Sequence, residues 1–213
     1  MIKIIQKEET HSQNYEWMSL YSLFSFANYF EPDNTCFGIV PTFNEYFVEA
    51  GHGFPMHPHQ DMELFYLILS GEMEHKDSLG NEQILEAGYL QRISAGSGIA
   101  RSAYNNGSDP LNYITIWMLP IAEKLAPSQE VKYFDKSLFQ DKFFPIASNK
   151  HNGMMDANSP VRSNANGTIY RACFTNDKPH LFKPESTHQL IYVLSGSVTV
   201  NGTVLRAGGH ARI

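Results

Sequence analysis

The chain has 213 residues, of which 42% are hydrophobic and 18% charged, and its 16 basic and 22 acidic side chains give a formal net charge of -6. This length suffices for one large domain or two small ones. An acidic chain without a run of Lys and Arg argues against direct nucleic-acid binding, which requires clustered cations. No segment has the roughly 20 uncharged apolar residues that span a membrane, and the N-terminal residues lack the apolar stretch of a signal peptide. We therefore expect a soluble, cytoplasmic protein with no membrane contact.

Short apolar runs separated by Gly, Asn, Asp and Pro recur along the chain, which is typical of an all-β sandwich or barrel. Three of these runs are LFYLIL at 64–69, YITIWM at 113–118 and LIYVL at 190–194. The polar segment DSLGN at 77–81 predicts a hairpin turn between two strands. Helical character is confined to 122–139, and Pro127 interrupts it.

A weak internal repeat relates residues 64–88 to residues 190–208. Each copy has an apolar strand, Ser-Gly, an alternating strand, a turn and Leu-x-Ala-Gly, which predicts duplicated barrels. Between the copies, 144–167 is crowded with Pro, Asn and Gly and predicts a long surface connection. We therefore divide the chain into an N-terminal barrel at 1–135 and a linker with a degenerate second barrel at 136–213.

The sequence His57-Pro58-His59 lies just before the first apolar strand. Because side chains alternate along a strand, His57, His59, Asp61 and Glu63 are expected on one face. Two neutral imidazoles that converge in this way suit a divalent metal. The pair alone is a weak signal, since nine histidines in 213 residues produce such spacings by chance. A solvated or hydrogen-bonded histidine pair is the alternative.

Longer motifs surround this pair. They are FSFANY at 24–29, GFPMHPHQDME at 53–63, GEMEHKDSLGN at 71–81, QRISAGSGI at 91–99 and IWMLP at 116–120. In these motifs the chain resembles the pirin family of bicupins. Together with the second repeat, the resemblance covers nearly the whole chain.

This resemblance implies two β-barrels packed face to face, with one metal, usually iron, in the N-terminal barrel. The family's ligands match His57, His59 and two further positions, a histidine and a glutamate, that correspond to Arg101 and Ala103. Bacterial members resemble quercetin 2,3-dioxygenases, which open a flavonol ring with dioxygen at that metal. Eukaryotic members look like nuclear co-regulators of transcription whose surface changes with the oxidation state of the iron.

The chain departs from the family at 98–105, which reads GIARSAYN. Arginine carries five donors and no acceptor and keeps its charge, so Arg101 cannot ligate a cation. If Arg101 points inward, it repels a divalent ion by several kcal/mol at about 4 Å and an effective dielectric near 20. In one interpretation the metal is lost, and Arg101, His57 and His59 form a cationic or hydrogen-bonding pocket for water, a carboxylate or a small anion.

In the other interpretation, Glu63 joins His57 and His59 as a third metal ligand. Such a 2-His-1-carboxylate set suits Fe(II) or another divalent metal. A straight strand places Glu63 about 13 Å beyond His59, so this set requires a bulge or a sharp bend. We therefore favour loss or weakening of the metal site, in which case no cofactor is bound.

Two hypotheses on function follow, and they leave open whether the protein is an enzyme. In the first, it is a non-enzymatic or weakly active ligand-binding or regulatory module for a small aromatic molecule or a small anion, with a protein partner as a further option. In the second, it is a metal-dependent quercetin 2,3-dioxygenase, an oxidoreductase. We expect His75 to order its hairpin turn rather than to bind a ligand. Candidates for an apolar lining around a planar ligand are Phe43, Phe47, Phe54, Tyr66, Met73 and Trp117.

The resemblance also bears on the second barrel. In the family, further strands follow the stretch that corresponds to 207–213 and complete that barrel. We therefore expect an incomplete second barrel with exposed edges, which is unstable alone, is completed by another chain or reflects a shortened gene.

Overall fold

The structure is a computed structural model that describes residues 2–150, 158–183 and 186–213. It is built almost entirely from β-strands, as the sequence predicts, with two short 3-10 turns, η1 (Lys7–Glu9) and η2 (Lys136–Leu138). No helix in these described ranges has the length and apolar character needed to cross a membrane.

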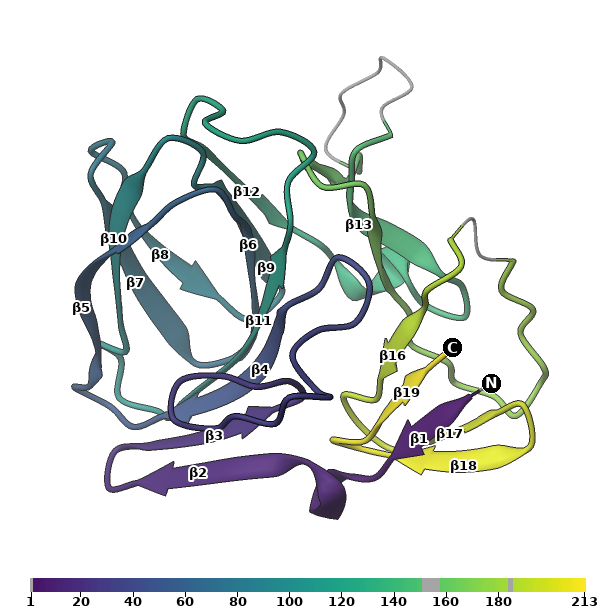
Figure 1. The fold of residues 1–213 in the computed structure, drawn as a ribbon. Coiled ribbons are helices and arrows are strands. Elements are labelled where there is room, and N and C mark those ends of the chain that lie inside the picture. The colour runs from purple at the N-terminus through teal and green to yellow at the C-terminus, as the bar shows by residue number, and fades with distance from the viewer. Residues whose placement is uncertain (1, 151–157, 184–185) are drawn as a thin grey trace.

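Two antiparallel sheets face each other in the first half of the chain (Figure 1). The smaller sheet has the order β5-β10-β7-β8, with strands β5 (Gly53–His59), β10 (Ile99–Tyr104), β7 (Glu72–Asp77) and β8 (Glu82–Glu86). The larger has the order β12-β9-β6-β11-β4-β3-β2. Its strands are β12 (Ser128–Tyr133), β9 (Tyr89–Ser94), β6 (Glu63–Ser70), β11 (Leu111–Met118), β4 (Thr42–Val48), β3 (Met18–Ser22) and β2 (His11–Tyr15).

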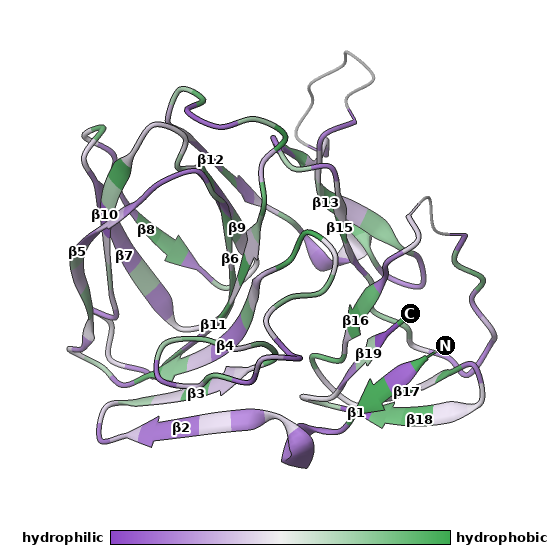
Figure 2. Cartoon of the chain, in the orientation of Figure 1, coloured by the Kyte–Doolittle hydropathy of each residue, from purple (hydrophilic) through white to green (hydrophobic). Residues whose placement is uncertain are grey.

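Strand β6 explains why one stretch of the sequence is apolar without alternation. Leu64, Tyr66 and Ile68 belong to the core between the two facing sheets. Phe65 and Leu67 belong to a second core, on the opposite face of the larger sheet. A strand that is buried on both faces needs apolar residues at every position. The hydropathy colouring in Figure 2 shows the smaller sheet mixing polar and apolar residues along its strands.

The remaining strands, β1 and those from β13 onward, form three small sheets. One has the order β1-β19-β16, with β1 (Lys3–Ile5), β19 (His210–Arg212) and β16 (Leu190–Tyr192). Another has the order β14-β13-β15, with β14 (Val161–Arg162), β13 (Phe144–Ser148) and β15 (Thr168–Arg171). The third pairs β17 (Ser197–Val200) with β18 (Thr203–Arg206).

The predicted repeat is confirmed at the level of strands and turns. The first copy forms β6, β7 and β8, and the second forms β16, β17 and β18. Gly71 and Gly196, which follow the apolar strand in each copy, have φ angles of 72° and 70°. Gly88 and Gly208, which end the copies, have φ angles of 92° and 80°. Glycines at equivalent positions therefore give the backbone the same turns in both copies.

Two local predictions are wrong. Residues 122–139 form no α-helix, because 128–133 pairs as β12 along the edge of β9, an arrangement that a helical period does not reveal. The stretch 144–167 is not simply a surface connection, since Ile146, Ala147 and Val161 lie in the second core. The part of that stretch at 151–157 lies outside the described residues.

The division at residue 135 stays a prediction. In the structure, β1 pairs with β19 rather than with a strand of the first half, and the register joins Lys3 to Arg212. The earliest residues therefore contribute to the sheet of the C-terminal part.

Candidate functional site

The candidate site lies on the smaller sheet, where β10 runs between β5 and β7. Arg101 on β10 is the Cα partner of His57 on β5 and of Asp77 on β7. Because directly paired residues project to the same side of a sheet, these three side chains share one face. The strand period adds His59 to that face. The structure thus places His57, His59 and Arg101 on one face of the smaller sheet.

The two histidines lie at the margin of the core. Their ring centroids are 4.8 Å apart, and His57 Nδ1 lies 2.7 Å from the Pro55 carbonyl oxygen. The His59 ring lies 5.3 Å from that of Trp117, and its buried Nε2 has no hydrogen-bond partner. Burial lowers the pKa of His59 to about 4, and the charges of His57 and Arg101 act in the same direction. His59 is therefore a neutral imidazole at physiological pH.

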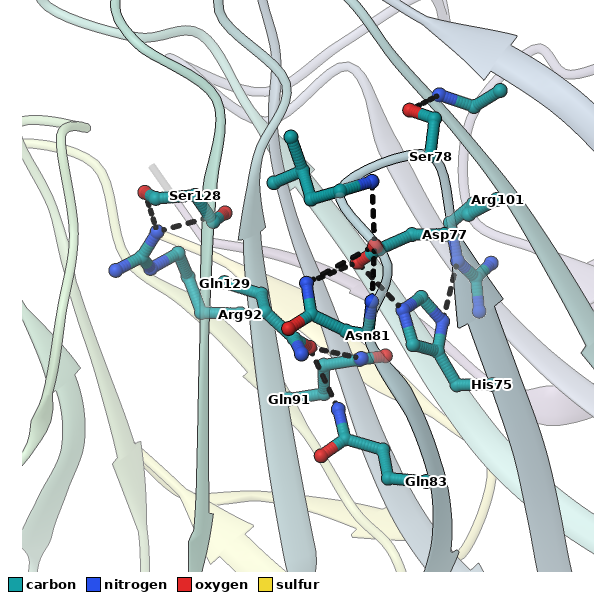
Figure 3. A network of polar contacts seen from close by, with 12 residues as sticks. His75, Asp77, Ser78, Asn81, Gln83, Gln91, Arg92, Arg101, Ser128 and Gln129 are labelled. Atoms are coloured by element: carbon teal, nitrogen blue, oxygen red, sulfur yellow. Dashed lines mark hydrogen bonds and ion pairs between the residues drawn. The ribbon is translucent and has the colours of Figure 1, made fainter.

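Arg101 points into the core and is only 2% exposed. Its guanidinium lies 4.0 Å from the centre of the Tyr66 ring, and Nη2 lies 3.7 Å from the Met73 sulfur. Its Nε donates to His75 Nδ1 at 3.4 Å. Figure 3 shows this contact continuing from His75 Nε2 to Asp77 Oδ2, at 3.1 Å. The result is a buried row of three polar side chains, one on β10 and two on β7.

This row fixes the protonation of His75. Arginine can only donate, so Nδ1 of His75 must accept and Nε2 must carry the proton that goes to Asp77. Burial is the main cause that lowers the pKa of His75 to about 4, and the Arg101 charge adds to it, against the opposing effect of Asp77. Hydrogen bonds from Asn81, His75 and Leu79 lower the pKa of Asp77 although burial opposes them.

The prediction for His75 therefore needs a correction. Asp77 orders the hairpin turn, because its Oδ1 accepts from the backbone N–H of Leu79 at 2.9 Å and of Asn81 at 3.1 Å. His75 instead links that carboxylate to Arg101. The signal that could have revealed this role is the alternation along β7, which places Met73, His75 and Asp77 on the buried face.

Aromatic rings form the opposite wall. Tyr46 and Tyr113 stack with ring centroids 5.0 Å apart, and Tyr66 lies 6.4 Å from Tyr113. All three belong to the core between the sheets, together with the partly buried Phe54 and Trp117. Burial raises the pKa of each of the three phenols, so all stay protonated. The predicted lining residues Tyr66, Met73, Phe54 and Trp117 thus belong to this core, whereas Phe43 belongs to the second core.

Glu63 has partners elsewhere. It is fully buried at the start of β6, where it accepts hydrogen bonds from Ser94 Oγ and from the backbone N–H of Asn164, the latter at 3.0 Å. These contacts tie the larger sheet to a loop of the second half. The structure thus gives the carboxylate of Glu63 a connecting role between the two halves.

Among the described residues, the candidate site offers two side chains that could ligate a metal, His57 and His59. The unpartnered Nε2 of His59 and the neighbouring His57 suit a metal. On the neighbouring strand β10, Arg101 pairs with His57 and its charge repels a cation, while Ala103 pairs with Phe54 and has no donor atom in its side chain. Within the described residues no group of three or more His, Cys, Asp and Glu side chains is placed to hold a metal ion. These residues do not form a complete metal site, and we derive no chemical step through a metal.

Two facing β-sheets with an inward-facing histidine pair define a protein of the cupin class. A quercetin 2,3-dioxygenase from Acinetobacter baumannii shares the fold at a TM-score of 0.69, with 19% identity over 100% of this chain and 79% of that one. The chain matches the family described as Pirin over residues 5–118, and it belongs to the pirin family.

More similar relatives extend this assignment over the whole chain. A quercetin 2,3-dioxygenase from Escherichia coli K12 is 33% identical over 210 residues, which cover 95% of this chain and 85% of the relative. The crystal structure of the bacterial pirin YhhW from Escherichia coli in complex with nickel(II) superposes with a TM-score of 0.91 and 30% identity, over 100% of this chain and 90% of that one. A divalent metal is thus bound by a protein similar to this one.

Proposed function

We propose that this pirin-family protein binds a small ligand between its two facing sheets without a resident metal, and that it is weakly active or inactive in flavonol ring opening. The observation that carries the proposal is the position of Arg101. Arg101 pairs with His57 on the neighbouring strand, and its buried guanidinium lies over Tyr66. A fixed positive charge there opposes a second cation by several kcal/mol at about 4 Å and an effective dielectric near 20.

The resemblance to the family supports the same conclusion. On the resemblance of 98–105 to the family pattern, Arg101 and Ala103 correspond to the third and fourth ligands. Neither side chain can donate an electron pair to a metal. A ligand-binding protein of this kind would act through occupancy of the pocket, with a protein partner that senses the occupied state.

A second candidate is a metal-dependent quercetin 2,3-dioxygenase. It is favoured by the Escherichia coli quercetin 2,3-dioxygenase, which is 33% identical over 95% of this chain. In that case His57 and His59 would hold Fe(II) or another divalent metal such as nickel, and the third position would fall to Glu63 or water. Glu63 would first have to give up its contacts with Ser94 and Asn164.

Metal content distinguishes the two functions. The untagged protein, purified with and without added Fe(II), is analysed by elemental mass spectrometry, and quercetin consumption is followed by absorbance. We expect well below one metal ion per chain and no metal-dependent loss of quercetin. Near-stoichiometric metal together with turnover would establish the dioxygenase instead.

The double variant Arg101→His with Ala103→Glu is the matched test of the site itself. It restores two donors beside His57 and His59, and we expect metal affinity to rise by orders of magnitude. Arg101→His alone supplies three donors and should give an intermediate affinity. If the double variant binds no more metal than the natural chain, positions 101 and 103 do not face the histidine pair and the proposal fails.

A further inference from the structure

Three arginines of the described chain are buried, and two of them donate hydrogen bonds to oxygen atoms. Arg92 donates to Ser128 Oγ at 2.7 Å and lies 3.6 Å from a carboxylate oxygen of Glu130. Arg212 donates to Asn34 Oδ1 at 2.7 Å. Such contacts are the usual condition for burying a guanidinium. Each guanidinium thus has at least two oxygen acceptors, although the buried Nε of Arg212 has no partner among the described residues.

Arg101 is the exception. Its polar contacts are with an imidazole nitrogen of His75, the thioether of Met73, and both the ring and the hydroxyl group of Tyr66. Within the described part of the chain no carboxylate lies within 4 Å of it, and no carbonyl oxygen accepts from it. A guanidinium has five N–H donors, so several of them remain without a strong acceptor. Burying a guanidinium without an anionic partner costs free energy of folding, and a bound anion that accepts its N–H groups would offset that cost.

Asp77 does not serve as that anion. Its two oxygens are taken up by the backbone and side chain of Asn81, by the backbone N–H of Leu79 and by His75. The imidazole of His75 separates the carboxylate from Arg101. This arrangement holds the guanidinium in a fixed orientation but leaves its remaining donors free for another molecule.

Two further buried polar atoms of the described residues have no partner, one on each of the two facing sheets. His59 Nε2 and Trp117 Nε1 are both buried and unpaired, and their rings are 5.3 Å apart. His59 projects to the same face as Arg101, and it also lines a surface hollow of about 420 Å³ with Gln60, Ser78 and Ile99. His59 therefore borders this surface hollow and also shares a sheet face with Arg101.

The tyrosines of the larger sheet, opposite Arg101, indicate what kind of molecule could bind beside the guanidinium. Tyr46 and Tyr113 stack on each other in this wall, and Arg101 lies over the ring of Tyr66. Aromatic faces favour a planar, apolar body in stacked or edge-on contact. Planar guanidinium groups favour carboxylates, which accept two N–H bonds side by side.

We infer that Arg101 anchors a small aromatic carboxylate, whose carboxylate group accepts the free N–H donors and whose ring packs against the tyrosine wall. The inference rests on the proposed function, because a metal held by His57 and His59 would compete for the same space. His75 is then a positioning residue, since it acts through Arg101.

The test uses the full chain and benzoate as the probe. Isothermal titration calorimetry should show saturable binding of one benzoate per chain. Benzyl alcohol, which keeps the ring without the charge, and acetate, which keeps the charge without the ring, should each bind at least tenfold more weakly. Equal binding of benzyl alcohol would overturn the role of Arg101, and equal binding of acetate would overturn the aromatic assignment.

Variants localise the binding. Arg101→Met should lose benzoate binding by at least tenfold, and Arg101→Lys, which keeps the charge without the planar fork, should retain part of it. Lys142→Met changes the net charge equally at an exposed position and should bind as the natural chain does. Ala103→Glu keeps Arg101 and supplies an internal carboxylate on the same strand face, so it should also abolish binding, which covers the case in which Arg101→Met fails to fold.

Metal content measured on the same preparation separates the two proposals. Metal-free protein that shows no saturable benzoate binding overturns the carboxylate site and leaves the proposed function standing. Near-stoichiometric metal overturns the proposed function. Benzoate binding that Arg101→Met and Ala103→Glu leave unchanged also overturns the inference.

Discussion

The two copies of the repeat follow the same path but hold different residues in their interiors. In the first copy, β7 directs Met73, His75 and Asp77 inward, and all three are buried. In the second copy, β17 directs Val198 and Val200 to the less exposed face. Counted from the shared turn glycine, His75 corresponds to Val200. Turn glycines and strand alternation therefore specify the course of the backbone in both copies. The residues at the inward-facing positions decide whether the interior of each copy contains polar, ionisable side chains.

The turn glycines offer the largest expected difference between the copies. A Cβ at Gly71 would lie 2.7 Å from the Pro110 carbonyl oxygen, whereas a Cβ at Gly196 would meet nothing within 4 Å. Both residues have a left-handed backbone, which alone costs about 1–2 kcal/mol in a residue with a side chain. We expect Gly196→Ala to lower the unfolding free energy by about 1 kcal/mol and Gly71→Ala by about 3 kcal/mol or more. Urea denaturation measures both, and equal losses would contradict the close approach at Gly71.

The second-largest expected loss of stability comes from replacing His75 by valine, the residue found at the corresponding position 200 of the second copy. His75→Val leaves Arg101 and Asp77 buried without the imidazole that joins them, and we expect a loss of about 2–3 kcal/mol in unfolding free energy. The control is Thr199→Val, on the exposed face of β17, which should change stability by less than about 0.5 kcal/mol. A loss for His75→Val no larger than that of the control would show that the row on β7 and β10 is not coupled.

The two halves of the chain each contain a buried histidine, His75 and His210, that makes the unfolding free energy depend on pH. Burial, with the nearby Arg101 charge, lowers the pKa of His75 to about 4. Burial, with Arg212 and then Lys3, lowers the pKa of His210 to about 3. Unfolded histidine has a pKa near 6.5, so the unfolded chain takes up more protons below that pH. The unfolding free energy is therefore unaffected by these histidines above about pH 6.5. It decreases as the pH falls from about 6.5 toward the pKa of each histidine in the folded protein.

The expected slope is at most about 1.4 kcal/mol per pH unit for each histidine. We expect His210→Gln to reduce the slope of unfolding free energy by about 1 kcal/mol per pH unit between pH 6 and 4.5. His75→Gln should act similarly, although its effect ends at a higher pH. Denaturant titrations at three pH values provide the measurement, and a variant with an unchanged slope would show that its histidine is not buried as a neutral ring.

Local patterns revealed much of the fold and part of the site. The hairpin at 77–81, the repeat and the shared face of His57 and His59 follow from turn residues and strand period. The contacts of Arg101 with His75 and of Glu63 with Asn164 join strands or loops far apart in the sequence. No local pattern encodes such pairs. Likewise, 128–133 forms a strand because β9 offers an edge, whereas its own composition suggested a helix.

The pairing of β1 with β19 has a consequence for how the protein is made. Lys3 is synthesised roughly two hundred residues before its partner Arg212, so β1 stays unpaired while all the strands between them are made. Contacts of such long separation form slowly, because a long loop must close first. The sheet formed by β1, β19 and β16 is therefore expected to assemble last, after the pair of sheets that carries Arg101 has already folded.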